Sequence, residues 1–264
     1  MSGRGDASGN GDASDDYDLD SGPDPAAFAA AEPEPSAVSD GVVHAVGIGP
    51  GNPEYLTPRG ERAIREADVV VGFETVIEYV AESIEGEALA CGYRDEGETL
   101  ARFAERVAAG ERGTAVLMGD PNHSGYQFVG KVQRAVDRPV RVVPGISSLQ
   151  VAASRARTPM EATEFVTLHR SGSIDDELAR LRRAVGDRHL LVLPRPFDWM
   201  PGDVAAHLRS AGAPADLPAL VLERLTHEDE QITQTTLGAL AEEAGGDARE
   251  ETRFSDLSVL AVRR

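Results

Sequence analysis

The feature that most constrains the fold is a regular alternation of short apolar runs with segments of helical spacing. The runs are continuous rather than interrupted by polar residues, which is typical of strands buried on both faces. They lie at residues 42–48, 67–72, 88–91, 114–118 and 140–143, and the helical segments lie at 57–67, 74–84, 97–110 and 124–136. Thr57 followed by Pro58 is a favourable helix start. This order predicts a parallel sheet with helices on both faces.

The second half of the chain has a less regular pattern. Strands are predicted at 164–168, 189–193, 219–223, 233–237 and 257–262, and helices near 174–185 and 202–211. Because strands here follow one another without a helix each time, we expect a mixed α/β fold with at least one antiparallel pair. The chain is therefore expected to form an N-terminal α/β domain at 41–157 and a C-terminal mixed α/β domain at 158–264.

The first 40 residues form a separate region of the sequence. They hold ten acidic side chains and one base, Arg4, and are rich in Gly, Ser, Asp, Ala and Pro. Such a segment buries too little apolar surface to offset its chain entropy. We expect residues 1–40 to be a disordered acidic tail, and we assign it no function.

The strongly acidic charge restricts the possible partners. The formal net charge is −19 at pH 7, which disfavours binding to nucleic acids or to anionic membranes. No apolar run is long enough to span a bilayer and no secretory signal is evident, so we expect a cytoplasmic protein. The single cysteine, Cys91, fits a reducing compartment. Only Lys131 among 26 basic residues is a lysine, which resembles the proteins of salt-loving archaea; a mesophile with a GC-rich gene would also favour arginine.

Glycine-containing turns follow three of the predicted strands, at residues 47–52, 119–121 and 144–148. Ligands bind beyond the carboxyl ends of strands in open parallel sheets, so the turns are candidate site elements. The first turn has Asn52 where the dinucleotide fingerprint requires a third glycine, and it lacks the Gly-Lys-Ser/Thr of a phosphate-binding loop. Structural alternatives are a tight turn, a turn aspartate at Asp120 and a helix cap at Ser147 or Ser148.

These turns resemble the motifs of the tetrapyrrole (precorrin) methylase family in order and spacing, and the resemblance covers 42–262. Residues 144–150, followed by 167–170, are most similar to the family members that methylate C5 of cobalt-precorrin-7 in cobalamin biosynthesis. The resemblance implies a C-methyltransferase that binds S-adenosylmethionine between its two domains. Residues 122–126 depart from the family, in which an apolar or aromatic residue more often follows the proline. The implied cofactor-binding residues are Gly49, Pro50, Gly51, Gly119, Asp120, His123, Ser147, Ser148, Leu168, Arg224 and Leu225.

The resemblance also implies a tetrapyrrole substrate with many carboxylates, which arginines bind well. The candidates near the domain junction are Arg155, Arg157, His169 and Arg170, with solvated surface positions as the alternative. Transfer from a sulfonium needs alignment and exclusion of water more than a strong base, and the sequence assigns no catalytic residue. His and Cys spacing typical of a metal site is absent, so any cobalt would arrive within the substrate.

Other functions remain open at this point. The fold could serve another acceptor, such as a different precorrin carbon, a diphthine precursor or ribosomal RNA, although the acidic charge disfavours RNA. A non-catalytic nucleotide-binding protein is a second class. A dehydrogenase is a third, in which Glu74 would stand for the ribose-binding acid. The family resemblance further implies a homodimer and a separate enzyme for C15 methylation and decarboxylation.

Overall fold

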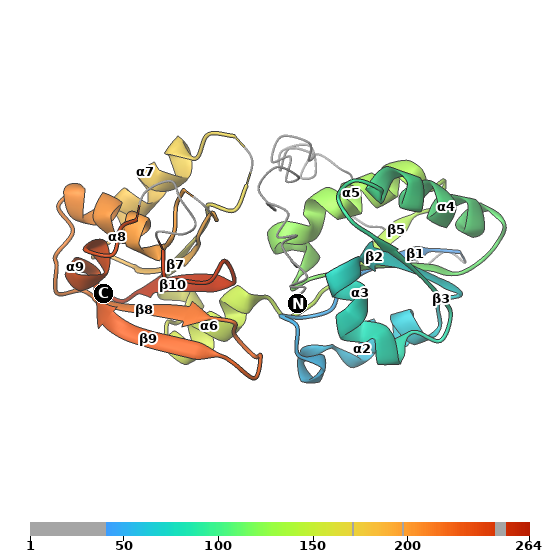
Figure 1. The fold of residues 1–264 in the computed structure, drawn as a ribbon, viewed down its shortest axis with the longest axis horizontal. Coiled ribbons are helices and arrows are strands. Elements are labelled where there is room, and N and C mark those ends of the chain that lie inside the picture. The colour runs from blue at the N-terminus through green and yellow to red at the C-terminus, as the bar shows by residue number, and fades with distance from the viewer. Residues whose placement is uncertain (1–40, 171, 197, 246–251) are drawn as a thin grey trace, which may run out of the picture.

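The computed structural model describes residues 41–170, 172–196, 198–245 and 252–264, and the predicted acidic tail at 1–40 lies outside the described residues. Two five-stranded sheets follow one another along the chain, and Figure 1 shows them side by side. None of the helices in the described part of the chain has the length and apolar character needed to cross a membrane.

The first sheet is parallel throughout its paired strands, with the order β3-β2-β4-β1-β5. Helices α4 and α5 pack on one face and α2 and α3 on the other (Figure 1), which confirms the predicted architecture. The order places the ends of β4, β1 and β5 next to one another. The elements are β1 (Val43–Gly47), α2 (Pro58–Arg65), β2 (Val69–Phe73), α3 (Glu74–Val80), β3 (Glu87–Cys91), α4 (Glu96–Ala108), β4 (Gly113–Leu117), α5 (Tyr126–Ala135) and β5 (Val140–Val143).

Local interactions explain where two of these helices begin. Thr57 caps α2 by accepting a hydrogen bond from the backbone N–H of Gly60 at 3.1 Å, as the sequence predicts. The helix predicted from residue 124 starts earlier, with one π-helical turn over Pro121–Gly125 that leads into α5. Asp120 caps this turn by accepting a hydrogen bond from the N–H of Asn122, and a proline at the first position needs no N–H partner.

The second sheet is mixed, with the order β6-β7-β10-β8-β9. Its β6–β7 pair is parallel, and its other three pairs are antiparallel, which confirms the prediction for this half. Helices α7, α8 and α9 pack on one face and α6 on the other. The elements are α6 (Ser148–Ala156), β6 (Thr163–Thr167), α7 (Asp175–Ala184), β7 (His189–Leu193), α8 (Pro201–Ser210), β8 (Pro218–Glu223), β9 (Gln231–Thr236), α9 (Leu237–Ala241) and β10 (Ser258–Val262).

Helix α6 packs with the second half, although it precedes the predicted domain boundary at 157/158. Its buried face, which includes Ala152, contacts Leu191 and Val259 of the second sheet. Figure 1 shows α6 beside β8 and β10. We therefore propose that the domain boundary falls in the turn at residues 144–147.

Candidate active site

The three glycine-containing turns meet at the carboxyl ends of β4, β1 and β5. Gly49 and Gly119 form an isolated bridge, with the Gly119 N–H donating to the Gly49 carbonyl at 2.7 Å and the reverse bond at 3.3 Å. Asp120 Oδ2 accepts a hydrogen bond from the Gly145 N–H at 3.1 Å. The second turn is therefore bonded to both of its neighbours.

Glycine is required at this junction because backbone meets backbone. A Cβ added to Gly145 would lie 2.1 Å from the Gly119 carbonyl oxygen, and one added to Gly47 would lie 2.5 Å from the same atom. Real Cβ atoms essentially never approach closer than 3.0 Å. We call Gly47, Gly119 and Gly145 the glycine junction.

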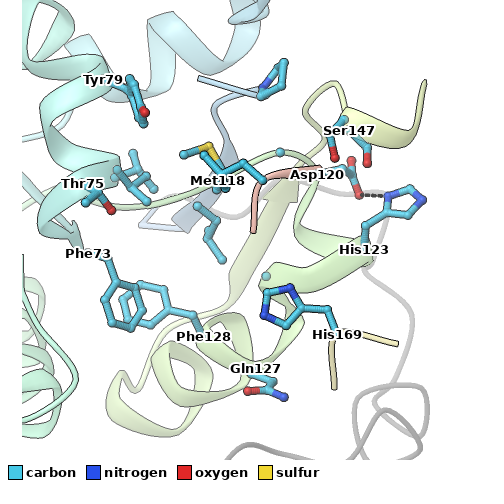
Figure 2. Close-up of a pocket in the computed structure, with 18 of the residues that line it drawn as sticks. Phe73, Thr75, Tyr79, Met118, Asp120, His123, Gln127, Phe128, Ser147 and His169 are labelled. Carbon is cyan, nitrogen blue, oxygen red and sulfur yellow. Dashed lines mark ion pairs between the residues drawn. The ribbon is translucent and has the colours of Figure 1, made fainter. Parts of the chain in front are cut away.

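Asp120 organises the second turn from a position that is only 8% exposed. Its Oδ1 accepts hydrogen bonds from the backbone and the side chain of Asn122, at 2.8 and 3.0 Å. His123 Nδ1 lies 3.6 Å from the same oxygen (Figure 2). These contacts, together with the bond to Gly145, match the structural alternative of a turn aspartate and leave its carboxylate at the edge of the site.

Ser147 has a comparable structural role at the third turn. Its hydroxyl accepts a hydrogen bond from the Leu149 N–H at 3.2 Å, and Gln150 Oε1 accepts one from the Ser147 N–H at 2.8 Å. These two bonds form a capping box at the start of α6. The third turn thus starts the helix that packs on the second sheet.

A cavity of about 670 Å³ opens beside these turns, and residues from both halves line it. Its volume lies in the usual range of small-molecule sites, roughly 300–1,000 Å³. Figure 2 shows Thr75 and Tyr79 on one wall, Asp120 and Ser147 on another, and His169 reaching in from the second half. A molecule in the cavity would contact both sheets' strand ends.

Most of the predicted site residues line this cavity, and some do not. Leu168 is fully buried in the core of the second half, and Gly49 and Gly51 lie in the first turn without lining the cavity. Arg155 and Arg157 line a separate small hollow with Arg263. The residues that line the cavity are Pro50, Gly119, Asp120, His123, Ser147, Ser148, His169, Arg170, Arg224 and Leu225.

An aromatic group in the first half also lines the cavity, and sequence reasoning missed it. The ring centroid of Phe73 lies 4.9 Å from that of Tyr93 and 5.4 Å from that of Phe128. We call these three residues the aromatic group; Figure 2 shows the contact of Phe73 with Phe128. Single aromatic residues at the end of a strand, in a turn and on a helix carry no sequence signal for such a contact.

A partly buried ion pair lies beside the aromatic group. The ammonium of Lys131 donates to Glu96 Oε2 at 2.5 Å, and both residues line the cavity. Lys131 is the only lysine in the chain, and this is the sequence feature that could have marked it as a candidate site residue.

Several cavity-lining polar atoms are buried without a hydrogen-bond partner among the residues described. They are Glu96 Oε1, Arg170 Nε, Ser258 Oγ and Arg224 Nε, the last of which still lies 2.8 Å from Asp229 Oδ2 in an ion pair. Buried polar atoms usually find a partner, so such atoms on a cavity wall point to a ligand or to water. The acceptor of Glu96 and the donor of Arg170 would suit a ligand that carries polar groups of both kinds.

Two titratable groups of the cavity are held in their neutral forms. Enclosure by the cavity walls lowers the pKa of His169 below 6.5, against an opposing effect of Asp256. Burial, followed by the charges of Glu96 and Asp95, raises the pKa of Cys91 to about 12. His169 therefore offers a neutral imidazole to a ligand, and Cys91 offers no thiolate. Within the described ranges, no three His, Cys, Asp or Glu side chains gather as a metal site.

Fold and cavity together define a two-part α/β protein with a cavity of small-molecule size at the strand ends of a parallel sheet. Residues 42–241 match the family of Tetrapyrrole (Corrin/Porphyrin) Methylases, and the chain belongs to this family of methyltransferases. The family uses S-adenosylmethionine as methyl donor.

One relative and two solved structures show the range of similarity. The relative is a probable cobalt-precorrin-7 C(5)-methyltransferase of Methanocaldococcus jannaschii, 28% identical over 206 residues that cover 78% of this chain and 93% of the relative. A cobalt precorrin-4 methyltransferase structure has a TM-score of 0.66 at 20% identity, over 86% and 97% of the two chains. A uroporphyrin-III C-methyl transferase of Thermus thermophilus, complexed with S-adenyl homocysteine, has a TM-score of 0.63 at 25% identity, over 84% and 97%.

Proposed function

We propose that this tetrapyrrole methylase transfers a methyl group from S-adenosylmethionine to C5 of cobalt-precorrin-7. The observation that carries the choice of acceptor is the similarity to the M. jannaschii enzyme, which extends over nearly its whole length. The similarities to precorrin-4 and uroporphyrin-III methylases make other tetrapyrrole carbons the main alternative.

The cofactor end of the cavity is proposed to lie at the three turns. Pro50, Gly119 and Asp120 line it from the first half, while Arg224 and Leu225 line it from the second half. S-adenosylmethionine, when bound, supplies a methyl group on a positively charged sulfur, and its product leaves as a neutral thioether. The chain's contribution is to fix the turns, which the glycine junction and Asp120 do, and to exclude water from the reacting groups.

The substrate end is proposed to lie at the aromatic group. A large conjugated macrocycle can pack against Phe73, Tyr93 and Phe128, because aromatic faces bury much apolar area. Two of the cations that line the cavity, Lys131 and Arg170, are proposed to bind its carboxylates. Of the four arginine and histidine positions predicted for the substrate, His169 and Arg170 are kept in this proposal.

The test is to incubate the full chain with ¹³C-methyl-labelled S-adenosylmethionine and cobalt-precorrin-7, at low and at molar KCl, and to locate the label by NMR. Label at C5 is the expected result. Parallel reactions contain uroporphyrinogen III or the protein acceptor of diphthine synthesis. Label at another carbon, or only in a parallel reaction, would overturn the proposed acceptor and leave the methylase assignment intact.

Three further expectations are proposed with this function. The acidic, lysine-poor composition supports a salt-adapted protein, which should be more stable to heat in molar KCl than in dilute buffer. The family resemblance supports a cytoplasmic homodimer, which sedimentation would test. It also supports a separate enzyme for C15 methylation and decarboxylation, so this chain alone should leave C15 unmodified.

A further inference from the structure

The first turn touches the second half of the chain through two polar contacts. Asn52 Nδ2 donates a hydrogen bond to the carbonyl oxygen of Thr226 at 3.0 Å. His227 Nε2 lies 3.2 Å from the carbonyl oxygen of Pro50. A carbonyl oxygen can only accept, so Nε2 of His227 carries the proton in this contact. Each bond joins residues more than 170 positions apart in the sequence.

The imidazole of His227 also packs directly on the first turn. Gly51 has a φ of +115°, and a Cβ built on it would lie 2.6 Å from His227 Cε1. On another side, the ring of Tyr79 meets the imidazole edge-on, with centroids 5.7 Å apart. The imidazole therefore fits between the turn and α3 only because residue 51 has no side chain.

The segment that carries His227 has an unusual backbone. Arg224 and Thr226 have φ values of +46° and +74°, a left-handed conformation that is rare for residues other than glycine and strained for a β-branched one. Glu230 holds the segment in this shape, since its Oε2 accepts a hydrogen bond from the Thr226 N–H at 2.7 Å. Its Oε1 accepts one from Arg155 at 3.0 Å. Strain of this kind persists where surrounding contacts fix it, often at ligand sites.

We propose that Asn52, Thr226 and His227 form an interdomain latch that positions the first turn for ligand binding. Pro50, Arg224 and His227 all line the cavity, so one ligand can contact both sides of the latch. If the latch opens, the first turn and the segment of His227 no longer keep a fixed distance from each other. Part of the binding free energy must then restore that distance, so the affinity for the ligand falls. Arg155, which does not line the cavity, acts on the latch through Glu230.

The latch predicts effects on binding that differ from effects on the chemical step. The experiment uses the proposed function only to choose S-adenosylhomocysteine as the probe, and the full chain is studied by calorimetry. His227→Ala should weaken binding about tenfold, the usual value of one hydrogen bond made with good geometry. It should raise the KM for the methyl donor more than it lowers kcat. His227→Gln should recover most of the affinity, because its amide N–H can donate to the Pro50 carbonyl. Glu228→Ala, an exposed change in the same segment, is the matched control and should bind as the wild type does.

A double-mutant cycle separates the contact from general damage. Gly51→Ala should weaken binding for two reasons: alanine is strained at a φ of +115°, and its Cβ clashes with the imidazole of His227. In the double variant, His227→Ala removes the clash and leaves only the strain. The combined loss should therefore be smaller than the product of the two single losses. Independent effects of the two changes, or equal losses in His227→Ala and His227→Gln, would overturn the latch.

Amide hydrogen exchange without any ligand tests the latch even if the proposed function is wrong. His227→Ala should speed exchange in residues 50–56 and 224–230, and Glu228→Ala should not. If the wild type ignores S-adenosylhomocysteine but these segments loosen as expected, the proposed function fails and the latch stands. If exchange in residues 50–56 is unchanged in His227→Ala, the latch is refuted, whatever the protein binds.

Discussion

Replacing Gly145 by alanine tests whether the glycine junction holds the three turns together. The new Cβ would lie 2.1 Å from the Gly119 carbonyl oxygen and 2.7 Å from the backbone of Gly47, so backbone must move by about 0.9 Å to reach the 3.0 Å limit of real contacts. Overpacking against such a rigid neighbour costs about 1–3 kcal/mol. Weakening the charged hydrogen bond from the Gly145 N–H to Asp120 adds about 1.5–3 kcal/mol.

The expected loss for Gly145→Ala is therefore about 2.5–6 kcal/mol, a large part of a typical folding free energy of about 5–15 kcal/mol. The matched control is Gly97→Ala in the first turn of α4, where the added Cβ would meet no described atom within 4 Å apart from its chain neighbours and the helix's own backbone, and φ is not positive. The control should gain about 0.4–1 kcal/mol by restricting the unfolded chain. Unfolding in guanidinium chloride measures the change in unfolding free energy of both variants, and their affinity for S-adenosylhomocysteine is a second readout. A Gly145→Ala protein within about 0.5 kcal/mol of the wild type would refute the steric reasoning.

Three further predictions concern charged and titratable groups. Asp120→Asn should lower the unfolding free energy by about 1.5–3 kcal/mol, because the amide cannot accept all three hydrogen bonds; an unchanged denaturation midpoint would contradict this. Because the pKa of Cys91 is raised to about 12, its thiol should resist iodoacetamide at pH 8 until the protein unfolds. The unfolding free energy should also fall above pH 9, where the thiol ionises in the unfolded chain but not in the folded one. Rapid labelling of the folded protein would be the contrary result. Arg112 lowers the pKa of Asp68 to about 2, chiefly by hydrogen bonding, so this exposed pair should stabilise the fold above pH 3.8 and lose its effect as the pH falls toward 2. Asp68→Asn should therefore lower the melting temperature at neutral pH, and less so in molar KCl; a loss independent of salt would contradict the screening argument.

The sequence predicts the parts of the site that depend on single strands and the turns after them. Continuous apolar runs indicate parallel strands, and in a parallel sheet the turns after those strands lie at one edge. The residues that the second half of the chain contributes to the cavity depend instead on how its strands pair. Ser258 reaches the cavity because β10 pairs antiparallel with β8, which places it opposite Glu223 and beside Arg224. No spacing in the sequence specifies that pairing.

Arg155 shows the same limit within one helix. Its place near the domain junction made it a candidate for substrate carboxylates. The face of α6 that meets the second sheet is set by Leu149, Ala152 and Ala156, and Arg155 lies outside that face. Its guanidinium donates to Glu230, and this hydrogen bond is the main reason that the pKa of Arg155 is raised. Proximity in sequence to a junction does not determine which way a helical side chain points.

The charges of the cavity connect the acidic composition to the proposed substrate. Lys131, Arg170 and Arg224 line the cavity, and each is paired with a carboxylate of the chain itself: Glu96, Glu177 and Asp229, respectively. A substrate carboxylate must therefore share a cation that already has an anionic partner. It gains less binding free energy than it would from an unpaired cation. In molar salt the Debye length is about 3 Å, so repulsion from the rest of the acidic surface is screened beyond direct contact. Under those conditions burial against the aromatic group is expected to supply most of the affinity, while the paired cations fix the orientation of the macrocycle.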